Sequence, residues 1–155
     1  MGLPGPVRSA LALALTLAGA AALALAAHAD PVEEIVDAAR ADCAGFENGV
    51  FQANDAVIDA DLDGKEPGDR LVDTTCTSAR SLYCGSGGCM LHAVIGERSW
   101  SFQAEGWRMI AWDGRPILLV ARDGGWCGGA GSQLCFEAVV WSFGEMLTVM
   151  PPARR

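Results

Sequence analysis

The stretch SWSFQAEGWRMIAWDGRPILLVAR, residues 99–122, decides the fold of this 155-residue chain. Apolar and polar residues alternate through its first six positions, which predicts a strand with one buried face. Two pairs of an acidic residue and a glycine follow, Glu105-Gly106 and Asp113-Gly114, and each predicts a tight turn between antiparallel strands. The stretch therefore predicts an antiparallel meander. Its strands are expected at residues 99–104, 107–112 and 116–121.

The flanking segments extend this β-rich pattern over residues 50–150. Short segments rich in apolar or β-branched residues predict four more strands. Ahead of them, Asp30 suits a helix N-cap and Pro31 the first helical position, so we expect a helix at residues 31–43. The predicted fold class is mainly β, an antiparallel meander forming a small sandwich or barrel-like domain with one N-terminal α-helix. The additional strands are expected at residues 71–75, 89–95, 134–141 and 146–150.

The N-terminal segment has the pattern of an export signal. Residues 10–27 are almost all apolar or small, and an A-x-A motif at residues 27–29 ends the run. An uncleaved membrane anchor is the alternative, but the small-residue motif lies where a signal peptidase cuts. We expect a signal peptide at residues 1–29 and a single mature domain, residues 30–155, in the periplasm or secreted, with no stable membrane insertion.

The charge of the chain is acidic and unevenly distributed. Without Arg8 of the leader, 10 basic and 19 acidic residues give a net charge of −9. Residues 30–73 hold 13 acidic residues against three basic ones, whereas residues 74–155 hold six against seven. Such an acidic half would be repelled by nucleic acid and by an anionic membrane, so we expect neither as a partner. A cationic partner and a merely solvated acidic surface both remain open.

All six cysteines follow the leader, and an even number in an exported chain predicts disulfides formed in an oxidising compartment. No C-x-x-C motif occurs, which disfavours redox or haem chemistry. Fifteen connectivities are possible, and glycine-rich loops favour two short bridges. The third bridge would then join the N-terminal segment to the rest of the domain and stabilise it by about 3 to 4 kcal/mol. The favoured pairs are Cys84–Cys89, Cys127–Cys135 and Cys43–Cys76.

Three segments together resemble a known pattern. They are ADLDGKEPGDRLVD at residues 60–73, LYCGSGGCML at residues 82–91 and GGWCGGAGSQLCFEAVVW at residues 124–141. The succession resembles a group of small exported bacterial proteins of uncharacterised function, in which a DLNGDGxxD-like segment is followed by CGxGGC and a later CGxxG…C. The resemblance covers residues 43–141 and implies an architecture rather than an activity.

The aspartate-rich segment is a candidate calcium loop with an incomplete ligand pattern. In the register of the resemblance, Asp61, Asp63 and Asp69 take the first, third and ninth loop positions, but Lys65 takes the fifth. In the other register, Asp59 replaces Asp69 as the third carboxylate. Calcium takes six to eight oxygen ligands, so either register would need backbone carbonyls and water as well. The alternative is an acidic turn in which the Lys65 ammonium pairs with Asp61 or Asp63.

The five tryptophans suit either a small β core or an aromatic recognition surface. Strand alternation puts Trp107 on the face of Met109 and places Trp112 with Ile110 on the opposite face. Most tryptophans are expected in the core. The candidates for an exposed binding surface are Trp126 and Trp112.

Catalytic signals are weak, and no catalytic residue is assigned. His92 is the only histidine after the leader, and a structural role is the simpler interpretation. The serines lack the G-x-S-x-G frame of a hydrolase.

Three functional classes remain open. The favoured one is a non-enzymatic module that binds a protein or glycan in the cell envelope, for example an inhibitor of a cationic envelope hydrolase. The alternatives are a structural accessory subunit of an envelope complex and an extracytoplasmic enzyme that depends on His92 or a metal.

Overall fold

The computed structural model describes residues 29–46, 48–65, 68–76 and 82–149. The predicted signal peptide therefore lies outside the described residues, apart from Ala29, as do Glu66 and Pro67 of the aspartate-rich segment. Among the described residues, no helix is long and apolar enough to cross a membrane.

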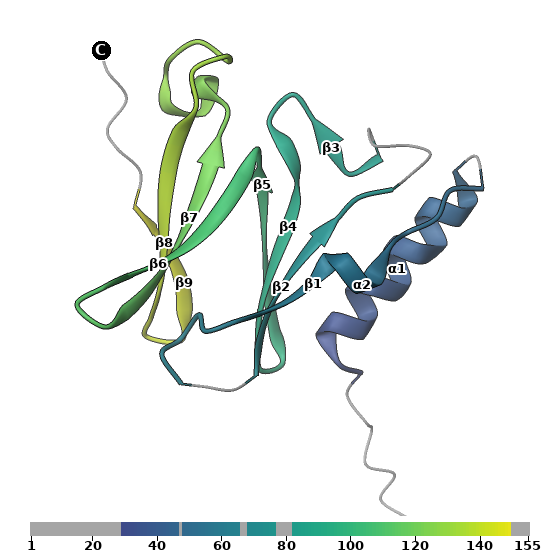
Figure 1. The fold of residues 1–155 in the computed structure, drawn as a ribbon, viewed down its shortest axis with the longest axis horizontal. Coiled ribbons are helices and arrows are strands. Elements are labelled where there is room, and N and C mark those ends of the chain that lie inside the picture. The colour runs from purple at the N-terminus through teal and green to yellow at the C-terminus, as the bar shows by residue number, and fades with distance from the viewer. Residues whose placement is uncertain (1–28, 47, 66–67, 77–81, 150–155) are drawn as a thin grey trace, which may run out of the picture.

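The chain folds into two antiparallel sheets with one long helix, the mainly β class that the sequence predicts (Figure 1). In the first sheet, strands β1, β2, β4 and β3 are neighbours in that order, and β5 also pairs with β4. Its strands are β1 (Val57–Ala60), β2 (Asp69–Thr74), β3 (Cys84–Gly85), β4 (Gly88–Ile95) and β5 (Arg98–Ala104). The second sheet follows sequence order, with β6 (Gly106–Trp112), β7 (Arg115–Arg122), β8 (Cys135–Ser142) and β9 (Glu145–Val149). The helices are α1 (Pro31–Gly45), α2 (Ala53–Ala56) and the short 3₁₀ helix η2 (Gly124–Cys127).

The main hydrophobic core lies between the two sheets. Alternate residues of each strand point inward, as the period-2 pattern of the sequence requires. Leu71 and Leu91 of the first sheet pack with Leu118, Val120 and Val139 of the second in one buried cluster. A sandwich rather than a barrel is therefore the form that this domain takes.

A second cluster joins α1 to the other face of the first sheet. Asp30 caps the helix by accepting a hydrogen bond from the Val32 amide at 2.9 Å, as the sequence predicts. Val36 and Ala39 of α1 are buried with Val72 and Val94 of the sheet. The first sheet is thus covered on both faces, by α1 on one side and by the second sheet on the other (Figure 1).

The three disulfides have the pairing that the sequence favours. Cys43–Cys76 fixes the end of α1 to the chain after β2, and both cysteines are buried. The other bridges, Cys84–Cys89 and Cys127–Cys135, each close a short loop. No described cysteine is free. Bridges of this kind are typical of a protein in an oxidising, extracytoplasmic environment.

The predicted hairpin turn at Glu105-Gly106 is wrong. β5 pairs with β4 and β6 pairs with β7, so the chain passes from one sheet to the other at this point. The Glu105 amide donates to the carbonyl of Ala121 in β7 at 2.8 Å, which anchors the corner. The inward residues Ala104 and Trp107 are three positions apart, and this break in the period of two is how both strands keep their apolar faces toward one core.

The hairpin predicted at Asp113-Gly114 is present between β6 and β7. Both residues have positive φ, 49° and 72°, as a two-residue turn of type I′ requires. Phe143 and Gly144 form a similar turn between β8 and β9, with φ of 53° and 81°. These turns fix the register of the second sheet.

Candidate functional site

The aspartate-rich segment brings three carboxylates together. One oxygen atom each from Asp61, Asp63 and Asp69 lies within 4.8 Å of the others. Asp69 is buried at the start of β2, and its Oδ2 accepts hydrogen bonds from the amides of Leu62 at 2.9 Å and Asp63 at 3.1 Å. Asp61 Oδ1 accepts from the Gly64 amide at 2.7 Å. These bonds hold the loop against the first sheet.

The fourth candidate ligand, Asp59, lies elsewhere. It is exposed on β1, where its carboxylate pairs with the guanidinium of Arg70 at 3.0 Å. The grouping therefore follows the register that begins at Asp61 and includes Asp69. Lys65 reaches the same group, because its Nζ lies 3.3 Å from Asp63 Oδ2.

The loop has the donor chemistry of a hard-cation site and also an internal cation. Three carboxylates supply three of the six to eight oxygens that calcium takes. The remaining ligands would have to come from backbone carbonyls and water. The ammonium of Lys65 meanwhile offsets one of the three charges without an ion. The geometry thus contains the elements of both interpretations, three grouped carboxylates for a cation and an ammonium partner for a self-neutralised turn.

A groove of about 450 Å³ lies beside this loop, at one end of the sandwich. The loop forms one wall with Asp63 and Gly64, and the β6–β7 hairpin and β8 form the others. Trp112, which is 75% exposed, stands at its edge, whereas Trp141 is partly buried and packs edge-on against Trp100, with ring centroids 5.4 Å apart. The other lining residues are Leu62, Gly114, Arg115, Pro116, Ile117, Val140 and Ser142.

Local structure explains why these residues meet. The turn at Asp113-Gly114 pairs Trp112 directly with Arg115 across the hairpin. Gly64 has a φ of 80°, and a side chain there would begin 3.8 Å from Cδ of Pro116. The acidic loop therefore packs closely against the start of β7, and the groove has a charged side and an aromatic side.

Trp126, the other tryptophan proposed for a binding surface, does not line this groove. It lies in η2 and is 55% exposed, and the Arg122 guanidinium lies 4.8 Å from its ring centroid. The two tryptophans lie near opposite ends of β7. Trp112 pairs with Arg115 at the start of this strand, and Trp126 follows shortly after its last residue, Arg122. The structure thus separates the two candidates.

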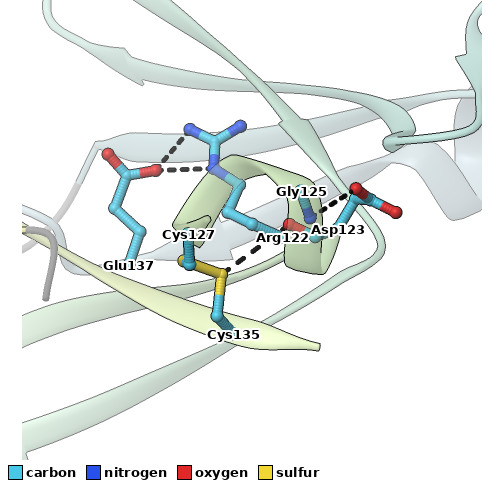
Figure 2. The surroundings of a disulfide bond; sticks show 6 residues. All are labelled: Arg122, Asp123, Gly125, Cys127, Cys135 and Glu137. Carbon is cyan, nitrogen blue, oxygen red and sulfur yellow. Dashed lines mark hydrogen bonds and ion pairs between the residues drawn. A yellow bond between two sulfur atoms is a disulfide. The ribbon is translucent and has the colours of Figure 1, made fainter. Parts of the chain in front are cut away.

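Figure 2 shows the surroundings of the disulfide that closes the loop after Trp126. Arg122 points to Glu137 and donates from Nε to Glu137 Oε2 at 2.6 Å. It also donates to the carbonyl of Gln103 in β5, so one side chain links the two sheets. Asp123 accepts from the Gly125 amide at 2.8 Å and caps η2. This end of the domain is therefore ordered by a buried ion pair and a disulfide.

Sequence reasoning missed the Arg122–Glu137 pair and the contribution of Arg115 and Trp141 to the groove. A signal for the pair was present. Arg122 is an even number of positions from Leu118 and Val120 on the same strand, so its side chain points to the core face as theirs do. Glu137 likewise lies two positions from the inward-pointing Val139 on β8. Two opposite charges at inward positions of neighbouring strands predict a buried ion pair once the register is known.

His92 lies away from the groove. It shares the helix-facing side of the first sheet with Val72 and Val94, and its Nδ1 lies 2.9 Å from Ser101 Oγ on the neighbouring strand. Burial lowers its pKa, and the negative charge of Asp73 offsets part of that effect. His92 is not one of the groove-lining residues.

In comparisons with family models, with curated proteins and with solved structures, the chain matches none.

Proposed function

We propose that this protein is an exported, non-enzymatic binding domain that acts in the periplasm or after secretion. It holds a segment of a protein partner of the cell envelope in the groove between the acidic loop and the β6–β7 hairpin. The observation that carries this proposal is the groove itself, where Trp112, Trp141 and Asp63 line one concave space.

The groove has the features of a recognition site. Its volume lies in the range of sites that hold small ligands or a few side chains, and its walls combine apolar surface with a small number of polar groups. Tryptophan is the residue type that most often dominates the binding energy of an interface. Trp112 is available for that role because most of its surface is exposed.

The overall charge of the domain favours a cationic protein segment over a neutral glycan. The groove lining itself holds one acidic residue, Asp63, and one basic residue, Arg115, but Asp63 belongs to the group of three carboxylates and the whole domain is acidic. An acidic surface raises the rate at which basic partners associate. A basic envelope hydrolase is one partner of this chemistry, and the domain would inhibit it by occupying its substrate-binding surface.

The experiment is capture of partners from a periplasmic extract by the oxidised protein, followed by affinity measurement with two matched variants. Trp112→Ala is expected to weaken binding by about 30-fold, because a central tryptophan contributes roughly 2 kcal/mol or more. Trp126→Ala removes an exposed tryptophan outside the groove and should leave affinity unchanged. Equal effects of the two substitutions would reject the groove as the site.

Asp63→Asn tests the charge of the partner. It should weaken binding of a basic protein and reduce the dependence of affinity on salt. Selective binding of neutral cell-wall glycans, unaffected by this substitution, would instead assign the groove to a sugar. The structural-subunit and enzyme hypotheses remain predictions, and activity lost on His92→Ala would favour the latter.

A further inference from the structure

The outer face of the second sheet is unusually apolar for a surface in water. Residues of β6 to β9 that point away from the core form rows defined by the strand register, and one row is Ile110, Ile117, Val140 and Leu147. None of these four side chains belongs to either buried cluster. Most soluble antiparallel sheets place polar residues on a face like this. The most exposed apolar side chains of the face are Ile110 (38%), Trp112 (75%), Phe136 (58%), Leu147 (44%) and Val149 (64%).

The central strand of this sheet has the sequence of a strand that is covered on both sides. Residues 117–121 of β7 read ILLVA without a polar residue. Uninterrupted apolar runs are typical of strands buried on both faces. The first sheet satisfies this condition because α1 covers its outer side, but among the described residues no helix lies over the outer face of the second sheet (Figure 1).

We infer that a second copy of this chain covers this face, so that the protein is a symmetric dimer with the two second sheets packed face to face. Such a contact would be isologous, with the same patch used by both copies. Two sheets stacked in this way interdigitate side chains as the two layers of a sandwich do.

The area of the face suits a dimer. The five exposed side chains named above present on the order of 600 Å² of surface, and a standard interface takes about 800 Å² from each partner. The half-buried residues between them, Ile117, Leu119, Ala138 and Val140, extend the patch toward that size, and the exposed Arg108, opposite Leu119, also lies on this face. The contact is therefore large enough to hold two copies together.

The distribution of charge favours a second copy approaching through this face. The acidic excess lies in residues 30–73, with 13 acidic and three basic residues, which form α1 and part of the first sheet. Residues 74–155, which include the whole second sheet, hold six acidic and seven basic residues. In a dimer through the second sheets, α1 and its acidic residues lie at the two far ends, where their mutual repulsion is weakest, whereas the acidic loop at the start of β7 lies near the contact.

The experiment measures the mass of the exported, oxidised protein in solution by light scattering from about 1 to 100 µM, a range in which an interface of standard size is populated. The native protein is expected to be a dimer. Leu147→Glu and Val149→Glu each place a carboxylate in the contact, and each should raise the dimer dissociation constant by at least about 100-fold. Trp112, Ile117 and Val140 belong to both the groove and this face, so a second copy and a partner segment would compete for them. Leu147 and Val149 do not line the groove, so their substitutions test the dimer alone.

Val50→Glu is the matched control. It adds the same charge at an apolar residue of similar exposure, 60%, that lies outside the second sheet. This variant should remain dimeric, and melting curves verify that all variants are folded. A native protein that is monomeric at 100 µM overturns the inference, as does a dimer that both sheet substitutions leave intact.

Discussion

Arg122 and Glu137 form an ion pair that is almost completely buried, with side-chain exposures of 6% and 4%. Removing one member of such a pair leaves an unpaired charge in the core. Glu137→Gln is therefore expected to lower the free energy of unfolding by about 3 kcal/mol. Urea unfolding monitored by circular dichroism measures this loss.

A double variant distinguishes pairing from packing at this position. Replacing both residues by apolar ones of similar size, Arg122→Met with Glu137→Leu, should recover most of the stability, because no charge is then left buried. A double variant as unstable as Glu137→Gln would show that the hydrogen bond from Arg122 to the Gln103 carbonyl matters more than the ion pair.

His92 gives the domain a dependence of stability on pH. Burial lowers the pKa of this imidazole in the folded state, so the unfolded chain binds its proton more readily. Stability should therefore fall as pH decreases through the unfolded value of about 6.5 toward the lower folded pKa. Melting temperatures between pH 5 and 8 measure the effect. His92→Gln should remove this component of the slope, and an unchanged slope would assign it to other groups.

Individual residues were predictable from the sequence where the alternation of side chains along a single strand decides which face they lie on. This alternation places Trp107 on the inward face with Met109 and Trp112 on the outward face with Ile110, as found. It does not show which strands are neighbours. The Arg122–Glu137 contact and the groove at Trp112 depend on that neighbourhood, so the sequence did not reveal them.

At the scale of elements, the acidic loop is expected to be a structural brace. The buried carboxylate of Asp69 accepts two backbone amides at one oxygen, Oδ2. Asp69→Asn should cost about 1–3 kcal/mol in the free energy of unfolding, because both amides then donate to a neutral oxygen and hydrogen bonds to a charged acceptor are roughly twice as strong. Asp59→Asn is the control. Its exposed ion pair with Arg70 should contribute less than about 1 kcal/mol.

The same pair of variants tests calcium at the loop. With Lys65 paired to Asp63, we expect the loss for Asp69→Asn to be equal in a chelator and in millimolar calcium. Thermal melting under both conditions measures it. A loss that grows in calcium, together with a rise in the melting temperature of the native protein, would make Asp69 part of a cation site.

The turns show how far local sequence determines the elements. Asp113-Gly114 was predictable because both residues tolerate the positive φ of a type I′ turn. Glu105-Gly106 has a similar composition but forms a corner between the two sheets. The inward-pointing residues on either side of it, Ala104 and Trp107, are three positions apart instead of two. β1 was not predicted, since its four residues include Asp59, one of the aspartates that suggested a loop, and directly precede Asp61 and Asp63.

The whole molecule is a sandwich whose two sheets are also joined by polar contacts at both ends. Arg122 links β7 to β5 at one end. Arg98, at the start of β5, pairs with Glu145 of β9 at 2.6 Å at the other end. The choice of a sandwich over a barrel was not predictable, because it depends on the corner at Glu105. The disulfide pairing was favoured correctly because two of the three loops are short.

The Cys43–Cys76 disulfide ties the helical layer to the sandwich, and its removal tests how far the layers depend on it. It closes a loop with a sequence separation of 33, so the double variant Cys43→Ala with Cys76→Ala should lose about 4 kcal/mol. The Cys84–Cys89 pair, with a separation of 5, serves as the control, and its double alanine variant should lose about 2 kcal/mol. Urea unfolding compares them. Both cysteines of the longer bridge are buried, so the lost side-chain packing adds to the entropic term. A smaller loss for Cys43–Cys76 than for Cys84–Cys89 would mean that α1 is held on the first sheet by its apolar contacts alone.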